Sequence, residues 1–330
     1  MNFTLDILGT ASALPTMKRY PSAQVLDVRG RLFLFDCGEG AQMQMRRMGI
    51  PYLRISVICI SHIHGDHIFG IFGLLSTMSM LGRTAHLDIF APRAFGPILK
   101  FYLSYFGEGS KFEIEHHVLS MKSPEKVWES RHLELEAFPL NHRIETYGFI
   151  LREKEPMFNV RKDAIERYGL TIAEIAALKR GADVVRPAGE DVSPGIGNGF
   201  RRFSGGPEPL VIRCSEAAYR PFIPRSYAYC SDTAPFPELP DWVRGVSLLY
   251  HEATFTDELS DIAEKTSHST ARQAAECASA AGACRLLIGH YSSRFTDTSV
   301  FLKEAKEVFP ATILANEGDV IEIPLEKMIP

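Results

Sequence analysis

The stretch Ser61-His62-Ile63-His64-Gly65-Asp66-His67 decides how the rest of this sequence is interpreted. It gathers three imidazoles and one carboxylate, which are the donors that suit zinc and related transition metals. His62 and His64 can point to one side while Asp66 and His67 point to another, which favours two metal ions over one. A histidine-rich turn without function is the alternative, but the density of ligand-type side chains argues against it.

An apolar run precedes this stretch. Residues Ile55–Ile60 have the length and the β-branched content of a buried strand. The ligand cluster therefore begins where a strand ends, and Gly65 can adopt the backbone angles that a turn requires. Two metal ions need more ligands than these four residues provide.

The missing ligands are expected at the ends of other strands. His142, Asp232 and His290 each follow a predicted strand closely. A His or Asp in such a place is more often a cap or a surface residue. In a sandwich of sheets, however, the three strand ends could converge on one edge, and together they complete the ligand count.

Size and composition set broad limits. The 330 residues suffice for one large domain or two, and 45% hydrophobic with 23% charged residues is typical of a globular protein. The apolar stretch Ile68–Leu81 is too short and too interrupted to span a bilayer, and no signal peptide is visible. The six cysteines form no C-x-x-C pair and are typical of buried thiols. We therefore expect a cytoplasmic protein without a membrane partner.

The predicted elements fall into two αβ halves. Strands and helices recur before residue 152 and after residue 209, which favours two sheets packed face to face with helices outside. Between these positions strand-like runs disappear, and two amphipathic helices (Val160–Tyr168 and Thr171–Lys179) precede a Gly- and Pro-rich loop. We expect residues 1–330 to form a single catalytic domain, with residues 152–209 as an inserted, flexible arm.

The charge distribution suggests a partner for this arm. A net charge of −4 argues against a general nucleic-acid binder, but residues 152–225 contain 13 Lys and Arg against 10 Asp and Glu. A solvated mixed-charge surface would look similar. The cations on the two predicted helices suit phosphate contacts that weaken as salt rises. They are Arg161, Lys162, Arg167, Lys179 and Arg180.

The motif H-x-H-x-D-H resembles the signature of the metallo-β-lactamase superfamily. The continuation Ile68–Leu75 resembles that of the ribonuclease Z family, endonucleases that trim the 3′ end of precursor tRNA. Leu34–Gly40, His251–Phe255 and His268–Thr270 match further motifs of that family. The resemblance covers nearly the whole chain and implies a four-layer αββα sandwich of the α/β (α+β) class. It is weakest in the arm, where Thr171–Gly181 lacks the Gly-Pro usually seen.

The resemblance also implies a ligand set for two Zn²⁺ ions per chain, with Mn²⁺ or another divalent transition metal as an alternative. His62, His64 and His142 would hold the first ion, and Asp66, His67 and His290 the second. Asp232 would bridge the two. A carboxylate suits that position because it has two oxygens and a negative charge that reduces repulsion between the cations.

The implied reaction is cleavage of precursor tRNA near the discriminator nucleotide, which leaves a 3′-hydroxyl on the tRNA and a 5′-phosphate on the trailer. Asp66 would accept a proton from the attacking water. His251 is the candidate proton donor to the leaving oxygen, and Glu252 could orient a nearby imidazole. His268 precedes the predicted helix at 271–281, whose N–H groups favour a phosphate unless Ser267 or Ser269 caps it.

Family members generally act as homodimers in which the arm clamps the elbow of tRNA. Here the arm could instead be a packing or dimer element. A small-molecule phosphodiesterase or lactonase, with the insert as a lid, is the alternative enzyme, and a non-catalytic, metal-dependent RNA-binding protein is the alternative of another class. Four histidines lack ligand-like neighbours and are not expected to bind the catalytic metals: His86, His116, His117 and His132.

Overall fold

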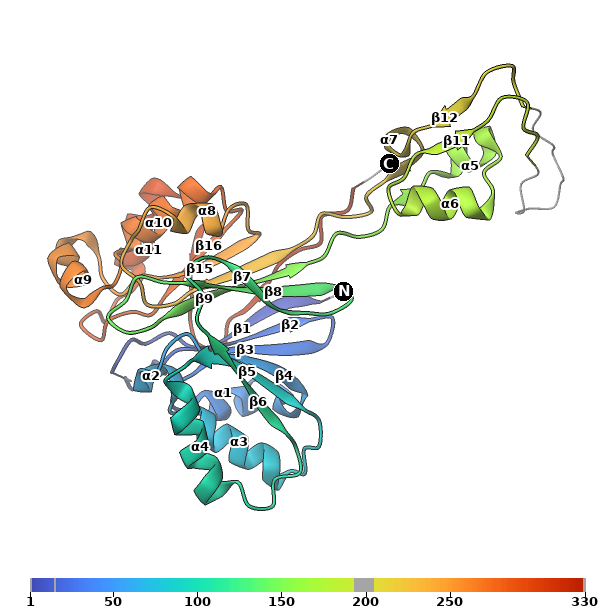
Figure 1. Cartoon of the computed structure of the whole chain (residues 1–330). Helices are drawn as coiled ribbons and strands as arrows, with labels where there is room; N and C mark the ends of the chain where they lie inside the picture. The colour runs from blue at the N-terminus through green and yellow to red at the C-terminus, as the bar shows by residue number, and fades with distance from the viewer. Residues whose placement is uncertain (1, 15, 193–204, 329–330) are drawn as a thin grey trace. The chain divides into compact units, whose positions relative to one another are not determined.

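The chain divides into two compact units. The computed structural model describes residues 2–14, 16–192 and 205–328 (Figure 1). The first unit comprises Met1–Glu153 and Arg225–Pro324, and the second comprises Lys154–Pro224 and Leu325–Pro330. The second unit contains nearly all of the segment expected as an arm, but it continues to Pro224 and takes in the last residues of the chain. Residues 193–204 of the expected arm lie outside the described residues.

The first unit contains two seven-stranded sheets. The first sheet has the order β18-β1-β2-β3-β4-β5-β6. Neighbouring strands from β18 to β3 pair antiparallel, and those from β3 to β6 pair parallel. Its strands are β1 (Phe3–Gly9), β2 (Ala23–Val28), β3 (Arg31–Cys37), β4 (Ile55–Cys59), β5 (Leu87–Pro92), β6 (Ile114–Leu119) and β18 (Val320–Glu322).

The second sheet has the order β17-β16-β15-β14-β9-β8-β7. Neighbouring strands from β17 to β14 pair parallel, and those from β14 to β7 pair antiparallel. Its strands are β7 (Glu125–Glu129), β8 (Leu133–Pro139), β9 (Tyr147–Glu153), β14 (Ser226–Cys230), β15 (Leu248–Glu252), β16 (Leu286–Gly289) and β17 (Thr312–Leu314).

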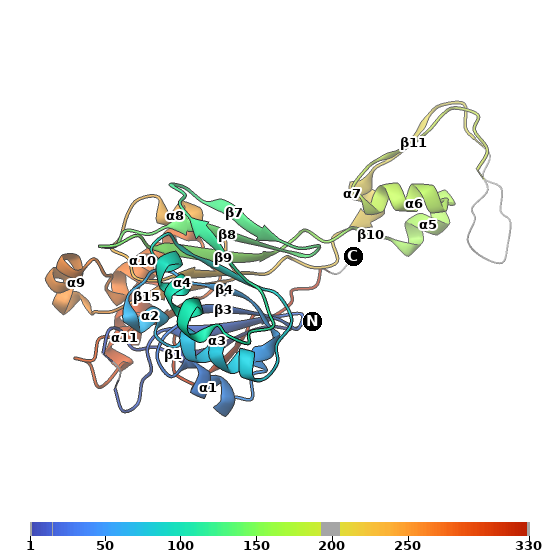
Figure 2. The same cartoon turned by 60° about the horizontal axis from the view of Figure 1, so that its bottom comes forward.

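Helices cover the outer face of each sheet (Figure 2). Buried side chains of α1 (Ala41–Arg47), α2 (Gly65–Ile68), α3 (Ile71–Met80) and α4 (Phe95–Phe106) share a core with the first sheet. Side chains of α8 (Leu239–Trp242), α10 (Ala271–Ala281) and α11 (Ser299–Val308) share a core with the second sheet. A third core lies between the sheets. The predicted four-layer αββα arrangement is therefore confirmed.

Helix α10 shows how the sequence produces one of these layers. Its buried residues are all alanines and recur at helical spacing, from Ala271 to Ala281, so the helix can lie close to the sheet. Thr270 and Gln273 form a capping box at its start, and Gly282 ends it with φ of 61°. Helix α9 (Ser260–Thr266) precedes it.

The second unit has a small core of its own. Helices α5 (Lys162–Tyr168) and α6 (Ile172–Lys179) bury Ala164 and Leu178 in it. Arg186 connects the two helices, because its guanidinium donates to the Tyr168 carbonyl and to Glu174. We expected no strands in residues 152–209, and this expectation is wrong because β10 (Asn159–Val160) and β11 (Val184–Arg186) lie there. They pair with two strands that follow the segment, β13 (Ala218–Tyr219) and β12 (Leu210–Ile212) respectively. Helix α7 (Cys214–Ala217) lies between β12 and β13 in the chain.

Among the described residues, none of the helices combines the length and the apolar character that crossing a membrane would require.

Candidate metal centre

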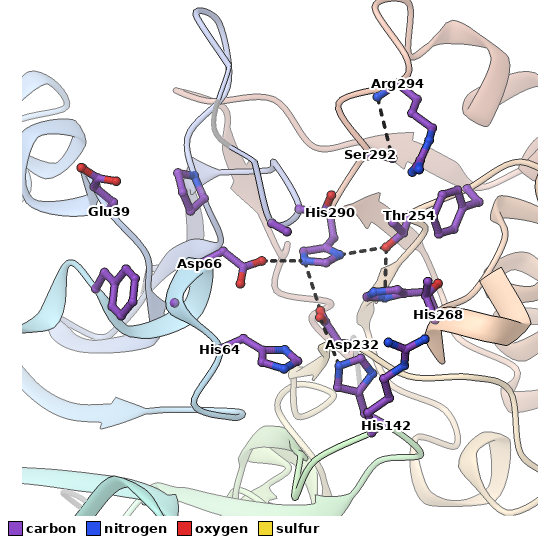
Figure 3. A pocket seen from close by; sticks show the side chains of 18 residues that line it. Glu39, His64, Asp66, His142, Asp232, Thr254, His268, His290, Ser292 and Arg294 are labelled. Carbon is purple, nitrogen blue, oxygen red and sulfur yellow. Dashed lines mark hydrogen bonds and ion pairs between the residues drawn. The ribbon is translucent and has the colours of Figure 1, made fainter. Parts of the chain in front are cut away.

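Four strands of the first unit deliver side chains to one place. The cluster from His62 to His67 follows β4, and His142 follows β8. Asp232 lies two residues after the end of β14, and His290 follows β16 directly. The structure therefore brings together all seven residues that the sequence suggested as metal ligands. Figure 3 shows those that line the adjoining cavity: His64, Asp66, His142, Asp232 and His290.

Asp232 stands at the middle of this cluster. Its Oδ2 lies 3.6 Å from His62 Nε2 and 3.8 Å from His142 Nε2. Its Oδ1 lies 3.5 Å from His67 Nε2 and 3.2 Å from His290 Nε2. The two carboxylate oxygens thus face two different sets of imidazoles, which is the arrangement a bridging ligand needs.

The other two members complete the two sets. Asp66 Oδ2 lies 3.4 Å from His67 Nε2 and 3.6 Å from His290 Nε2. His64 Nδ1 lies 2.9 Å from His62 Nε2. The ligand atoms of His62, His64, His142 and Asp232 form one close group, and those of Asp66, His67 and His290 form another.

Several nitrogen and oxygen atoms at the centre that could bind a metal are buried. Within the described part of the chain, four buried atoms there have no hydrogen-bond partner: Nε2 of His67, His142 and His290, and Oδ1 of Asp232. A buried polar atom without a partner costs about 1–3 kcal/mol. All four atoms belong to the two groups of ligand-type side chains, where a cation could bind them. The residues present therefore fit bound divalent cations.

The second nitrogen of each of four rings is held by a neighbour. His67 Nδ1 lies 2.7 Å from Asp36 Oδ2, and His142 Nδ1 lies 2.9 Å from the Ser267 carbonyl oxygen. His290 Nδ1 lies 2.9 Å from Thr254 Oγ1. A carbonyl can only accept, so His142 carries its proton on Nδ1 and directs the lone pair of Nε2 to the centre. His62 has a similar contact, from Nδ1 to Ser61 Oγ at 2.9 Å.

Backbone strain accompanies this arrangement. Asp36, Ser267 and His290 have φ of 52°, 57° and 64°, in the left-handed region that non-glycine residues rarely adopt. His290 is one of the predicted ligands, and Asp36 and Ser267 contact the rings of two others, His67 and His142. The fold thus accepts unfavourable backbone angles in order to aim these groups.

The electrostatics of the centre favour a positive charge. Burial alone would lower the pKa of His67, but Asp232, Asp66 and Asp36 raise that pKa well above its usual value. Burial would raise the pKa of Asp66, yet His67 and His290 hold it well below the usual range. The carboxylates that would retain a proton on His67 would equally attract a metal cation.

A cavity of about 630 Å³ opens onto the centre and is lined by His64, Asp66, Asp232 and His290. Two arginines also line it, Arg143 and Arg294, which the sequence analysis did not single out. Arg143 directly follows His142, so its place in the sequence beside a predicted ligand could have identified it. Arg294 lies over the ring of Phe255, with its guanidinium carbon 5.9 Å from the ring centroid.

Glu252 and His268 form a pair beside the cavity. His268 lines the cavity, and its Nδ1 lies 2.9 Å from Glu252 Oε1. Glu252 is fully buried and also accepts from the backbone N–H groups of Thr233, Thr254 and Ser269. Burial would lower the pKa of His268, but Glu252 raises it above its usual value. Glu252 therefore positions and polarises His268.

The structure corrects the expectation for His251. Successive side chains of a strand point to opposite faces, so His251 and Glu252 on β15 cannot both face the metal centre. His251 is buried on the helix side of the sheet, where it lines a separate cavity with Gln273 and Cys277. Its Nδ1 lies 2.7 Å from the carbonyl oxygen of Glu252. His251 cannot donate a proton to a group bound at the centre.

The expected phosphate site at the start of α10 is also corrected. Thr270 caps this helix, whereas Ser267 or Ser269 was suggested. The first N–H groups of the helix are used: Ala271 donates to the Phe255 carbonyl, and Arg272 donates to Glu304. The helix start offers those N–H groups to no phosphate, and His268 reaches the cavity through its own ring.

The cationic side chains suggested for the arm belong to the second unit. Lys162, Arg167, Lys179 and Arg180 are exposed, and Arg161 is half-buried. The guanidinium carbon of Arg161 lies 5.6 Å from the centroid of the Tyr219 ring. These residues lie on or beside α5 and α6, at the surface of that unit.

Relatives of this chain are found among known proteins. A family model described as anti-Pycsar protein Apyc1 matches residues 3–163. A protein named ribonuclease Z from Bacteroides thetaiotaomicron is 40% identical over 321 residues, which cover 97% of this chain and 95% of the relative. A protein of the same name from Parabacteroides distasonis is 41% identical over 317 residues, which cover 96% of this chain and 98% of the relative.

Solved structures agree on the fold. Human tRNase Z, short form, superimposes with a TM-score of 0.67 at 24% identity, over 97% of this chain and 99% of that chain. The metallo-β-lactamase fold protein YhfI from Bacillus subtilis gives a TM-score of 0.65 at 17% identity, over 98% of this chain and 100% of that chain. The predicted metallo-β-lactamase fold is therefore confirmed.

Proposed function

The chain belongs to the ribonuclease Z family, and from this premise we propose that it is a metal-dependent endoribonuclease that removes the 3′ trailer of precursor tRNA. Cleavage near the discriminator nucleotide would leave a 3′-hydroxyl on the tRNA and a 5′-phosphate on the trailer. The observation that carries the proposal is the cluster of seven ligand-type side chains with Asp232 at its middle, four of whose buried nitrogen and oxygen atoms have no hydrogen-bond partner among the described residues.

We assign two Zn²⁺ ions to this cluster, with Mn²⁺ as an alternative. His62, His64 and His142 would hold one ion, Asp66, His67 and His290 the other, and Asp232 would contact both. Bound divalent cations supply an acidified water and neutralise negative charge on a phosphodiester. The mixture of imidazole nitrogens and carboxylate oxygens supports a zinc-class metal.

Within this site we assign proton transfer to two residues, Asp66 as the acceptor and His268 as the donor. Asp66 lines the cavity, and its carboxylate would accept the proton of the attacking water. His268 would donate a proton to the leaving 3′-oxygen, since Glu252 holds its Nδ1 and the remaining ring nitrogen is left for the substrate. His268 thus takes the role that the sequence had suggested for His251.

Arg143 and Arg294 would bind the phosphates on either side of the scissile bond. Both line the cavity and both carry a permanent positive charge, which suits a polyanionic substrate better than a small neutral one. Their presence supports a phosphodiester over a lactam or lactone as the group that is hydrolysed.

The second unit would bind the body of the tRNA. Its exposed cations Lys162, Arg167, Lys179 and Arg180, together with Arg161, suit contacts to phosphates outside the acceptor end. The packed core around Leu178 supports a defined surface for this purpose. A role of the same unit in dimer packing is the competing assignment.

A homodimer in the cytoplasm completes the proposal. Phe101, Tyr105 and Phe106 of α4 are 60%, 71% and 66% exposed, and such apolar surface suits contact with a second copy of the chain.

The six cysteines support the cytoplasmic location. They are unpaired thiols, four of them buried, which is usual in a reducing compartment.

The function is tested by incubating the purified chain with a precursor tRNA carrying a 3′ trailer and with bis(p-nitrophenyl) phosphate. We expect cleavage of the precursor that depends on added Zn²⁺ or Mn²⁺ and is lost in Asp232→Ala. Hydrolysis of the small ester alone would point to a small-molecule phosphodiesterase. Precursor binding without cleavage by the metal-loaded chain would point to a non-catalytic RNA-binding protein.

A further inference from the structure

A second cluster of ligand-type side chains lies outside the proposed catalytic centre, on strands β5 and β6 and at the residue just before β5. His86 Nε2 lies 3.2 Å from Asp88 Oδ1 and 3.6 Å from Glu115 Oε2. The ligand atoms of these three residues all lie within 4.8 Å of one another. An imidazole nitrogen thus faces two carboxylates from two different strands.

The register of the two strands explains why these residues meet. Asp88 and Glu115 are direct partners in the parallel pairing of β5 with β6. His86 precedes Asp88 by two positions, so its side chain projects from the same side of the extended backbone. The spacing H-x-D, with His86 just before β5 and Asp88 within it, therefore places an imidazole and a carboxylate beside Glu115 of the edge strand β6.

From these contacts we propose that His86, Asp88 and Glu115 form a separate site for one divalent transition-metal ion of the zinc class. Ligand atoms placed tetrahedrally at about 2.0–2.2 Å from zinc lie about 3.3–3.6 Å apart. The separations of 3.2 and 3.6 Å at His86 bracket that spacing. They also match the separations of 3.2 to 3.8 Å around Asp232 in the proposed catalytic centre.

Two further residues lie beside these side chains. His117 Nε2 lies 2.7 Å from Asp88 Oδ1, and its ring stacks on Phe90 with centroids 4.5 Å apart. Glu113 Oε2 lies 3.7 Å from His86 Nδ1, so it faces the nitrogen that would not bind the ion. Metal ligands are commonly held by outer hydrogen bonds such as the one between His117 and Asp88.

The charges of these side chains also favour a bound cation. Asp88, Glu113 and Glu115 bring three carboxylates to one face of two neighbouring strands, against two imidazoles that are neutral unless protonated. A bound cation would relieve the repulsion among the carboxylates and would link the edge strand β6 to β5. The His86 side chain is 40% exposed, so this ion would exchange with solvent more readily than ions at the buried catalytic cluster.

The proposal is tested by equilibrium dialysis of the full chain against micromolar Zn²⁺, followed by metal analysis. The wild type should hold one more equivalent of zinc than His86→Gln and than Glu115→Gln. Both side chains are exposed enough for these variants to fold, and cleavage of precursor tRNA should be unchanged in both. His132→Gln, an exposed histidine outside the cluster, should keep the wild-type metal content.

A variant of the catalytic cluster separates this site from the proposed function. Asp232→Ala should lose zinc from the catalytic centre while keeping the equivalent that depends on His86. An unchanged zinc content in both His86→Gln and Glu115→Gln would overturn the proposal and leave the cluster as a set of hydrogen-bonded ion pairs. Binding that appears only at millimolar zinc would overturn it equally.

Discussion

Single residues outside the ligand set decide how the catalytic cluster is oriented. Asp36 accepts from the Ser61 backbone N–H at 2.7 Å, from the Tyr229 hydroxyl at 2.7 Å, and faces His67 Nδ1 at 2.7 Å. Its carboxylate thereby fixes one ligand ring and the start of the H-x-H-x-D-H loop together. Such outer partners typically contribute 10–100-fold to metal affinity.

Replacing Asp36 by Asn tests this role. Asn tolerates the left-handed backbone at this position, but it lacks the negative charge and one acceptor. We expect metal affinity to fall about 10-fold or more, with activity recovering in excess Zn²⁺. Zinc titration of the metal-free protein, followed by the cleavage rate, gives the measurement. Equal zinc affinities for variant and wild type would show that Asp36 has only a structural role.

His251 and His268 allow a paired test of the proton donor. Removing a general acid costs about 10²–10⁴-fold in rate. His268→Ala should therefore lower kcat by such a factor while its zinc content stays at the wild-type level. His251→Asn should retain kcat within a few-fold, because its ring lies on the other face of β15. Single-turnover cleavage of precursor tRNA measures both, and a large loss in the His251 variant alone would reverse the assignment.

At the level of elements, a buried ion network secures the point where β9 ends and β14 begins. Glu153 is 3% exposed and receives hydrogen bonds from Arg225 Nε at 2.9 Å and from Arg29 Nε at 3.2 Å. Arg225 also donates to the Ile323 carbonyl. The network thus ties both strand ends that border the second unit to the C-terminal part of the first unit.

Glu153→Gln should destabilise the protein by about 3–5 kcal/mol, because it removes the negative charge that faces the buried guanidinium of Arg225. The neighbouring Glu136→Gln is the matched control: Glu136 pairs with a partly exposed Arg152 at 3.7 Å and should cost less than about 1 kcal/mol. Urea unfolding at pH 7 measures both losses. Equal losses in the two variants would contradict the assignment.

The same network predicts a pH dependence. Burial would raise the pKa of Glu153, but Arg225 and Arg29 lower it below the usual 4.5. A depressed carboxyl pKa gives stability that is present above the unfolded value and is lost as pH falls through the folded value. The difference in unfolding free energy between wild type and Glu153→Gln should therefore be constant above pH 5 and shrink below about pH 4.5. A difference that does not change with pH would show that the charge of Glu153 is not the cause.

At the level of the whole molecule, we expect the first unit to carry out the cleavage and the second unit to bind the body of the substrate. Replacing Lys162, Lys179 and Arg180 by Gln should raise KM for precursor tRNA and leave hydrolysis of bis(p-nitrophenyl) phosphate unchanged. Each lost phosphate contact should reduce the slope of log affinity against log salt by about 0.9. Lys303→Gln with Lys306→Gln, on α11 of the first unit, is the control. A slope equal to that of the control would assign the second unit to packing instead.

The sequence by itself determined the features that depend on residues close to one another in the chain. The apolar run of β4, the ligand cluster behind it, and the helices α5 and α6 were predicted because periodicity and ligand spacing are local properties. His142, Asp232 and His290 were suggested because each follows a strand end. The four layers followed from the alternation of strands and helices.

Only the tertiary structure decided what depends on distant pairing. Edge strands β6 and β7 were not predicted, because charged and histidine side chains obscure their alternation and pairing with a neighbour stabilises them. Which of His251 and Glu252 faces the centre depends on the phase of β15, and every residue of that strand is buried between a sheet and helices. Asp36 meets His67 and Tyr229 only because strands far apart in the chain pack together. Sequence spacing identifies groups that can bind a metal, but packing decides which faces of the strands bring them together.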